Sequence, residues 1–496
     1  MSDWEQYFEK IDCDYNIRDN RNEFPYVYKN SCVKSPIIYK YRNENATELE
    51  KDLPMPPTDS LECMFYNCEL LTNIDALKNW DTSNVKFMSS MFNCCESLEN
   101  IDVLNDWDTS NVINMNSMFE HCKSLTNIDA LIDWDTSNVI NTSCMFFYCN
   151  SLENIDGLEN WNTQNIKNMR CMFFYCSSLE NIDALIYWNT SNVINIDHMF
   201  EGCNSLENID GLESWDTSKV INIEHIFNDC NSLSNIDGLK KWNTRNITDM
   251  SCIFYYCNSL ENIDALSNWD TRNVKDMNGM FYECKSLSNI NGLENWKTRK
   301  VKSFYRIFHN CNSLSNIEGL KNWNTRNVKV MSCMFENCSS LSNIDALIDW
   351  DTRNVKNMEF MFRECESLSN IDALSNWDTS NVKNMGYMFN KCNSLSDING
   401  LKDWNTENVE DMNYMFGNCE SLTNINALID WDTSNVKCTY RMFENCSSLS
   451  NIDGLKNWDT NNVECMEFMF ENCELLKYYP KNLYELKSFT AKTMNI

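Results

Sequence analysis

Residues 97–123, SLENIDVLNDWDTSNVINMNSMFEHCK, are one copy of a segment that recurs through most of the chain. A tryptophan stands at every 27th residue from Trp80 to Trp458, which makes fifteen copies. The consensus is S-L-x-N-I-D-[AG]-L-x-x-W-[DN]-T-x-N-V-x-x-M-x-x-M-F-x-x-C-x. A fixed period of this length is typical of a solenoid, in which successive copies form coils that stack on one another.

Stacking is required because 27 residues cannot bury their own apolar face. Placing one coil on the next sets leucine on leucine, tryptophan on tryptophan and phenylalanine on phenylalanine. We therefore expect one continuous core. In the quoted copy it consists of Leu98, Ile101, Leu104, Trp107, Val112, Met115, Met118, Phe119 and Cys122.

The motif also predicts the local structure of each coil. S-L-x-N-I and N-V-x-x-M are compatible with short parallel strands. The spacing in M-x-x-M-F-x-x-C favours a short helical turn. The position after Ile-Asp holds Gly or Ala in fourteen copies and valine only at Val103, so we expect a tight corner there.

Polar positions of the motif are expected to stabilise its turns. W-[DN]-T-x-N supplies side chains that bond to nearby backbone groups. Asparagines before the isoleucine and before the valine are predicted to form ladders of amides along the stack. The stacked acidic residues after the isoleucine repel one another, and they are predicted to cap the turn, with solvent or a bound cation as the alternatives. This acidic column comprises Asp75, Asp102, Asp129, Asp156, Asp183, Asp210, Asp237, Asp264, Glu318, Asp345, Asp372 and Asp453.

Three regions follow from the extent of the repeat. Residues 1–60 lack the motif and are predicted to form an N-terminal cap over the first coil. Residues 61–473 form the solenoid, and residues 474–496 are predicted to cap its other end. The irregular first region includes Tyr26, Tyr28 and Pro36.

Composition narrows the function. The 496 residues include 41 Lys and Arg against 72 Asp and Glu, a formal charge of −31, which argues against a general nucleic-acid binder. A hydrophobic content of 43% is enough for a large core. We find no nucleophile triad, metalloprotease motif or phosphate-binding loop, so no enzyme is predicted.

Cysteines fall into two groups. Sixteen of the 26 lie at 27-residue spacing from Cys68 to Cys473, and we expect them to form a buried column of small apolar side chains. Of the others, Cys144 and Cys171 occupy one position in adjacent coils and are the pair most prone to form a disulfide. His198 and His225 also stack, but no thiol lies at ligand spacing from them, so neither a metal site nor a cofactor is predicted.

Differences between copies indicate where a partner would bind. Arginine follows W-[DN]-T or W-K-T in five consecutive copies, and lysine lies two residues after the next asparagine position in five. These ten residues, termed the basic stripe, suggest a face that binds an anion or an acidic partner; the alternative is a solvated row that balances nearby carboxylates. They are Arg245, Arg272, Arg299, Arg326, Arg353, Lys275, Lys302, Lys329, Lys356 and Lys383.

Aromatic residues form a second candidate patch in the two positions between phenylalanine and cysteine. Exposed aromatic pairs on neighbouring coils suit a protein or carbohydrate contact. The alternative is that they pack under the N-terminal cap or against the helical turns. The patch consists of Phe147, Tyr148, Phe174, Tyr175, Tyr255, Tyr256 and Tyr282.

The repeat resembles that of BspA-like leucine-rich-repeat surface proteins, and in particular the mycoplasma surface-lipoprotein repeat of unknown function. The motif that carries the likeness is W-D-T-S-N-V, as in residues 80–85, followed by Met88, Met91 and Phe92. It extends over about 410 residues. The resemblance implies a leucine-rich-repeat-like solenoid that presents a surface for binding or adhesion without catalysis.

Location and assembly stay open at this point. The sequence has no signal peptide, lipobox cysteine or apolar run of about 18 residues, which predicts a cytoplasmic protein, whereas the resemblance implies the cell surface or a particle. We expect an interaction or adhesion scaffold that binds a protein or a carbohydrate. The alternative is a structural subunit whose solenoid faces pack in a shell, filament or particle coat.

Overall fold

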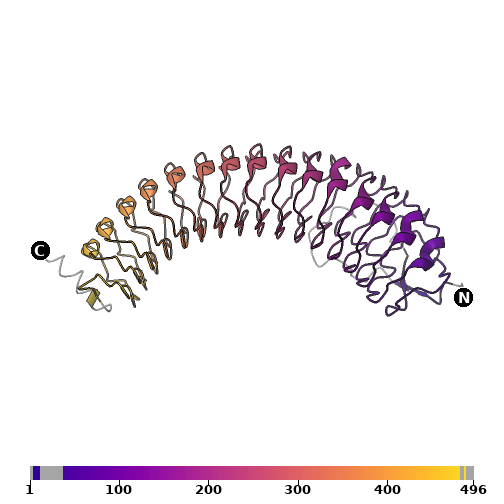
Figure 1. Cartoon of the computed structure of the whole chain (residues 1–496), viewed down its shortest axis with the longest axis horizontal. Helices are drawn as coiled ribbons and strands as arrows, with labels where there is room; N and C mark the ends of the chain where they lie inside the picture. Colours follow the sequence, from indigo (N-terminus) through magenta and orange to yellow (C-terminus); the bar gives the residue numbers. More distant parts are fainter. Residues whose placement is uncertain (1–3, 12–36, 481–484, 487–496) are drawn as a thin grey trace. The chain divides into compact units, whose positions relative to one another are not determined.

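The computed structural model describes residues 4–11, 37–480 and 485–486. The chain forms two compact units. The first comprises Met1–Asn231 and Asp237–Trp242, and the second comprises Ser232–Ile236 and Asn243–Ile496. Within each unit the repeats are coils stacked side by side, as Figure 1 shows. The predicted leucine-rich-repeat-like solenoid is confirmed.

Regular secondary structure is sparse among the described residues. Strands β1 (Phe8–Ile11) and β2 (Ile38–Tyr41) pair antiparallel, with Phe8 opposite Tyr41. Each coil contributes one 3-10 helix that starts at the acidic position of the motif. These helices are η1 (Asp75–Asn79), η2 (Asp102–Asp106), η3 (Asp129–Leu131), η4 (Asp156–Leu158), η5 (Asp183–Tyr187), η6 (Asp210–Leu212), η7 (Asp237–Leu239), η8 (Asp264–Leu266), η9 (Asn291–Leu293), η10 (Glu318–Leu320), η11 (Asp345–Leu347), η12 (Asp372–Leu374), η13 (Asn399–Leu401), η14 (Asn426–Leu428) and η15 (Asp453–Leu455).

Asparagine, rather than the acidic residue, holds the start of the 3-10 helix. Asn100 Oδ1 accepts a hydrogen bond from the Asp102 backbone N–H at 2.6 Å, and the same bond recurs in other coils. The predicted capping role of the Asp102 carboxylate was therefore wrong, because that side chain is exposed to water. Water accounts for the tolerance of an acidic column at coil spacing.

The prediction that stacked asparagine side chains bond to one another was also wrong, because their hydrogen bonds are to backbone groups. The asparagine before the valine does bond along the stack, but its acceptor is a backbone carbonyl. Asn111 Nδ2 donates to Ser83 O of the preceding coil at 2.8 Å. The W-[DN]-T-x-N turn behaves as expected, since Asp108 Oδ1 accepts the Ser110 N–H at 3.0 Å.

The corner after Ile-Asp is tight in the glycine-containing coils. A Cβ atom added at Gly292 would lie 2.2 Å from the Ile263 carbonyl oxygen of the preceding coil. Neither group is a flexible side chain, so the two backbones can approach this closely only without a Cβ atom. Coils with alanine at this position must hold their 3-10 helix further from the neighbouring carbonyl.

The predicted parallel strands are reduced to single bridges. In the N-V-x-x-M stretch, Asn114 bridges Asn141 in parallel. The Ile113 N–H donates to Lys86 O at 2.9 Å, and the Met115 N–H donates to Asn141 O at 3.0 Å. The chain turns immediately afterwards, so each coil has too few aligned residues for a strand.

The M-x-x-M-F-x-x-C segment, termed the turn run, is not the helical turn that its spacing predicted. In residues 88–95, Ser90 and Cys94 have positive φ angles of 54° and 61°, which a right-handed helix excludes. Successive N–H groups instead alternate between partners: Met91 donates to Met88 O within the coil, and Phe92 donates to Met118 O in the next one. The turn run is therefore a series of tight turns joined to its neighbours by a parallel ladder.

The core consists of side-chain columns that run through the coils of each unit. Phe119 and Phe146 stack with ring centroids 5.7 Å apart. Trp134 is buried, and its Nε1 donates to Leu104 O at 3.0 Å. The sixteen periodic cysteines are all buried, as predicted. Their thiols also bond between coils, as Cys122 Sγ does to Phe92 O at 3.3 Å.

The first coil is covered by the strand pair. Phe8 and Tyr41 are almost fully buried, with ring centroids 6.4 and 5.6 Å from that of Phe65. Trp80 Nε1 donates to Leu53 O at 2.8 Å. Leu53 O thus takes the place of the leucine carbonyl that a preceding coil supplies to later tryptophans. At the other end Tyr479 lies against Phe470.

The proposed region boundaries at residues 60 and 474 stay predictions. Tyr26, Tyr28 and Pro36 of the N-terminal region lie outside the described residues, as do 481–484 and 487–496 of the C-terminal one. Among the described residues, no helix combines the length and apolar character needed to cross a membrane.

Substitution of Gly292 by alanine should destabilise the second unit. The new methyl group would meet the Ile263 carbonyl, and overpacking of this kind typically costs about 1–3 kcal/mol. Urea unfolding followed by circular dichroism measures the change. The reverse change in a coil that carries alanine, Ala373→Gly, should cost about 1 kcal/mol or less. Equal unfolding midpoints for Gly292→Ala and the wild type would contradict the tight corner.

Alkaline pH should destabilise the fold through the cysteine column. Burial raises the pKa of Cys284 well above its usual value, and Cys122 and Cys338 behave alike. Both states hold the thiol proton below about pH 8.5, whereas above it only the unfolded chain ionises, so stability falls as the pH rises. Each thiol contributes about 1.4 kcal/mol per pH unit.

The matched variant is Cys284→Ala. Urea unfolding between about pH 8 and about pH 10 gives the free energy of unfolding at each pH. This free energy should fall less steeply with pH for the variant than for the wild type, by the contribution of one thiol. An identical pH dependence for the two proteins would refute the assignment.

Candidate binding surface

The turn run presents three side chains per coil outside the apolar columns. They occupy the position before the second methionine and the two positions between phenylalanine and cysteine, which are Ser117, Glu120 and His121 in the quoted copy. We call the surface formed by these positions the turn face. Its backbone is held by the intercoil ladder, while its side chains differ from coil to coil. This combination suits recognition, because variable groups are fixed on a constant frame.

All ten residues of the basic stripe are exposed. Arg272 Nε lies 2.7 Å from Asp270 Oδ1, and Arg353 Nε lies 2.8 Å from Asp351 Oδ1. Lys383 pairs with Glu410 at 3.3 Å. In the described part of the chain the other seven side chains form no ion pair: Arg245, Arg299, Arg326, Lys275, Lys302, Lys329 and Lys356.

Arginines of the stripe also act on the aspartate that precedes them in the turn. Desolvation alone would raise the pKa of Asp270, but the hydrogen bonds and charge of Arg272, together with the charge of Arg245, lower it below its usual value. Charge balance therefore explains part of the stripe. Arg245 takes part in this balance without an ion pair, and the balance does not explain the other six cations without one.

Aromatic residues of the first unit stack on one another. Ring centroids lie 4.5 Å apart for Phe147 and Phe174, and 5.1 Å apart for Tyr148 and Tyr175. His121 extends the second stack, 5.0 Å from Tyr148. Phe147 is buried and the other three patch residues are half-buried. Their ring contacts join aromatic positions of the turn face, both between adjacent coils and within one coil, as for Phe147 and Tyr148.

The aromatic residues of the second unit behave in the same way. Tyr255 and Tyr282 stack at 4.2 Å, and His309 continues the column 4.6 Å from Tyr282. Tyr256 is the exposed member, at 37%. Desolvation raises the pKa of Tyr255 and of Tyr282, so both phenols stay protonated at neutral pH.

A further aromatic column in the second unit was not predicted. Phe360, Tyr387 and Tyr414 stack at 4.7 and 4.6 Å. The Arg441 guanidinium follows, 4.8 Å from the half-exposed ring of Phe468. All five occupy the position before the second methionine, whereas the sequence search for aromatics covered only the two positions after the phenylalanine. A comparison of that position across the copies would have found them.

Two histidines and a glutamate also meet on the turn face of the first unit. One ligand atom each from His198, Glu201 and His225 lie within 4.8 Å of one another. The prediction of no metal site rested on the lack of a nearby thiol. The informative signal was H-x-x-E, residues 198–201, with a second histidine one repeat later.

The cysteines outside the periodic column form one disulfide in the described residues, and it is not the expected one. Cys144 and Cys171 are not joined by a disulfide; Cys144 hydrogen-bonds Cys171, which lowers the pKa of Cys171 despite its burial. Cys438 and Cys465 form a disulfide between adjacent coils, with Cα atoms 4.9 Å apart.

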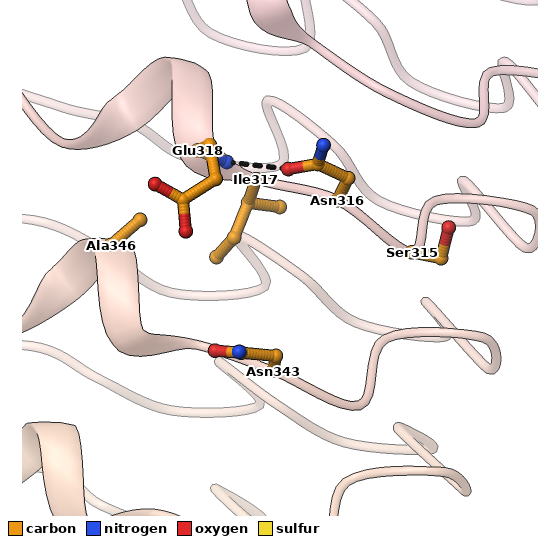
Figure 2. A pocket seen from close by; sticks show the side chains of 6 residues that line it. All are labelled: Ser315, Asn316, Ile317, Glu318, Asn343 and Ala346. Carbon is orange, nitrogen blue, oxygen red and sulfur yellow. Dashed lines mark hydrogen bonds between the residues drawn. The ribbon is translucent and has the colours of Figure 1, made fainter.

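A shallow hollow of about 230 Å³ lies between η10 and η11, lined by Ser315, Asn316, Ile317, Glu318, Asn343 and Ala346. Figure 2 shows the Glu318 carboxylate beside Ala346, and the bond from the Glu318 N–H to Asn316 Oδ1. The hollow lies where a coil with Gly319 at the corner is followed by one with Ala346 there.

The stacked coils define a leucine-rich-repeat-like solenoid. Residues 59–158, 153–261, 233–344, 314–427 and 396–494 each match the family described as Mycoplasma protein of unknown function, DUF285. These matches cover most of the chain, which therefore belongs to this family. The family assignment supports the mycoplasma resemblance drawn from the repeat. No curated protein matches the chain.

Solved leucine-rich repeat structures are similar to parts of this chain. A leucine-rich repeat protein from Bacteroides ovatus is 17% identical over 78% of this chain and 85% of its own, with a TM-score of 0.37. A leucine rich cell surface protein from Faecalibacterium prausnitzii is 19% identical over 57% and 79%, with a TM-score of 0.27. A leucine-rich repeat protein from Eubacterium ventriosum is 16% identical over 59% and 83%, with a TM-score of 0.29.

Substitution of Tyr387 by serine should be tolerated by the fold. Serine already occupies this position at Ser90 and Ser117, so the backbone is preserved. The loss of two ring stacks should cost about 1–2 kcal/mol, measured by urea unfolding. The buried neighbour provides the contrast, since Phe389→Ala should cost about 3–5 kcal/mol. Equal losses for the two variants would show that the turn face is part of the core.

Proposed function

We propose that this protein is a non-enzymatic interaction scaffold whose basic stripe binds an acidic protein partner. The observation that supports this proposal is the set of seven stripe cations without an ion pair on a chain of net charge −31. In such an acidic protein, carboxylates are abundant enough to neutralise every exposed cation. A row of cations that stays unneutralised is available to a partner.

The local structure holds the stripe arginines in register. Asn327 Nδ2 donates to Arg299 O at 2.7 Å, and Asn354 Nδ2 donates to Arg326 O at 2.8 Å. Arg245 and Arg353 are held in the same way, whereas the coil after Arg272 has Lys300 in place of the asparagine. Consecutive side chains then project at the spacing of the coils, which is about 4.8 Å for a parallel ladder.

An extended acidic segment would fit such a row. Charge complementarity raises the association rate and selects the partner more than it adds affinity. Several weak contacts along the row would act together. A partner with regularly spaced carboxylates would therefore bind in a salt-sensitive manner.

The proposal includes no catalysis. The hollow between η10 and η11, at about 230 Å³, is smaller than the 300–1,000 Å³ typical of small-molecule sites. Its polar lining is Ser315, Asn316, Glu318 and Asn343, which offers no histidine or lysine to activate a nucleophile. Adhesion at a cell surface, which the family resemblance implies, stays a prediction.

Replacement of the five stripe arginines by serine tests the proposal. Serine occupies the same position in other coils, as at Ser110 and Ser137, so the fold should persist. Affinity capture from native lysate and surface fractions, followed by titration of the captured partner, should show binding weakened on the order of tenfold or more. The remaining binding should depend less on salt.

The control replaces five lysines near the 3-10 helices by serine: Lys78, Lys240, Lys241, Lys321 and Lys402. It lowers the net charge by the same amount and should leave binding unchanged. If both variants lose the partner equally, net charge rather than the stripe controls binding. Full binding by the arginine variant would overturn the proposal.

A further inference from the structure

Two stacked histidines form the centre of a polar cluster on the turn face of the first unit. His198 and His225 occupy the same position in adjacent coils, and both have a φ angle of 55°. Their rings lie 4.8 Å apart and are parallel within 11°. Both are partly exposed, with 23% and 26% of the side chain accessible. The ladder of the turn run thus presents two imidazoles in the same orientation.

Equivalent nitrogens of the two rings face the same side. His198 Nδ1 lies 2.5 Å from Glu201 Oε2. His225 Nδ1 lies 3.1 Å from Asn228 Nδ2, which also donates to Glu201 Oε1 at 3.0 Å. Glu201 is therefore connected to both histidines, directly or through one amide. The three candidate ligand atoms lie within 4.8 Å of one another.

The opposite ring nitrogens face carboxylates. His198 Nε2 lies 3.9 Å from Asp197 Oδ2, and His225 Nε2 lies 3.7 Å from Glu224 Oε1. A carboxylate behind a histidine is the usual partner that orients a metal-binding imidazole and keeps the proton on the far nitrogen. At these distances neither carboxylate is hydrogen-bonded to its histidine, so the pairing is one of charge and would have to tighten to orient the ring.

Asp197 supplies an independent observation. Its side chain is only 6% exposed, and Oδ2 accepts a hydrogen bond from Arg170 Nε at 2.8 Å. Its other oxygen, Oδ1, is buried without a hydrogen-bond partner. A buried carboxylate oxygen without a partner is costly. His198 Nε2 lies 3.9 Å from Oδ2, beyond hydrogen-bond distance, so its N–H would reach this carboxylate only after a movement of the ring.

We propose that His198, Glu201 and His225 bind a zinc ion. Two imidazole nitrogens and one carboxylate oxygen are a ligand set that Zn²⁺ accepts, with water in the fourth position. Binding requires the ligand atoms to close to about 2.0–2.2 Å from the ion, through small side-chain rotations. The metal replaces the proton between His198 Nδ1 and Glu201, and the imidazole keeps a proton on Nε2, facing Asp197.

A simple ion pair between His198 and Glu201 is the competing explanation. It accounts for the 2.5 Å contact. It does not account for the place of His225, whose Nδ1 is linked to the same carboxylate through Asn228. A shared metal ion accounts for both, because ligand atoms of all three residues lie within 4.8 Å of one another.

The test compares zinc binding by the full chain and by His198→Ser/His225→Ser. Serine occupies this position in other coils, so the backbone should be retained, which circular dichroism checks. Isothermal titration with Zn²⁺ under reducing conditions should show one equivalent fewer for the double variant. Half-buried thiols such as Cys94, Cys144 and Cys252 also bind zinc, but they contribute equally to both proteins.

The matched control is His121→Asn, because asparagine occupies that position at Asn310 and Asn337. It should bind as many equivalents as the wild type. Titration with Co²⁺ adds a spectroscopic readout, in which the wild type should show the bands of a nitrogen and oxygen site that the double variant lacks.

Equal zinc stoichiometry in the wild type and the double variant would overturn the proposal. So would a Co²⁺ spectrum that is the same in both. If the double variant does not fold, Glu201→Gln replaces it. This variant should also bind one equivalent of zinc fewer than the wild type. A stoichiometry equal to that of the wild type would overturn the proposal.

Discussion

The structure depends on backbone groups that have no partner within their own coil. Half of the N–H groups in a turn run donate to the next coil, as Phe92 does to Met118 O. The polar side chains follow the same rule, since Trp134 Nε1 and Asn111 Nδ2 both bond to carbonyls of a neighbouring coil. Because buried backbone groups must be paired, a coil is stable only next to another coil with the same backbone path.

This requirement separates two classes of position. Side chains that point into the columns must repeat, since each packs against its own copy, and the buried Leu, Trp, Phe and Cys positions do repeat. Side chains that point outward from the turn run or the basic stripe contact one another, nearby turn residues or solvent. They can differ from coil to coil without loss of the ladder, so the chain's chemistry is concentrated there: stacked tyrosines, arginines on aromatic rings, and paired histidines.

The period and the core could be predicted from sequence because they depend only on spacing and apolar character. The turn run could not, because Met-Met-Phe-Cys spacing satisfies a helix equally well, and the positive φ angles at residues such as Ser90 and Tyr148 have no glycine to reveal them. The basic stripe was visible as consecutive copies of one residue. The contact between His198 and Glu201 joins two different positions of the motif, so a search along single columns could not find it.

The covered first coil shows which groups a coil needs from its neighbour, and this bears on how the number of copies can change in evolution. Within each unit the coils meet through one repeated pattern of backbone bonds, and Leu53 offers Trp80 the carbonyl that a preceding coil would otherwise provide. Gain or loss of one whole copy would therefore keep this pattern, whereas an insertion of a few residues within a copy would break it.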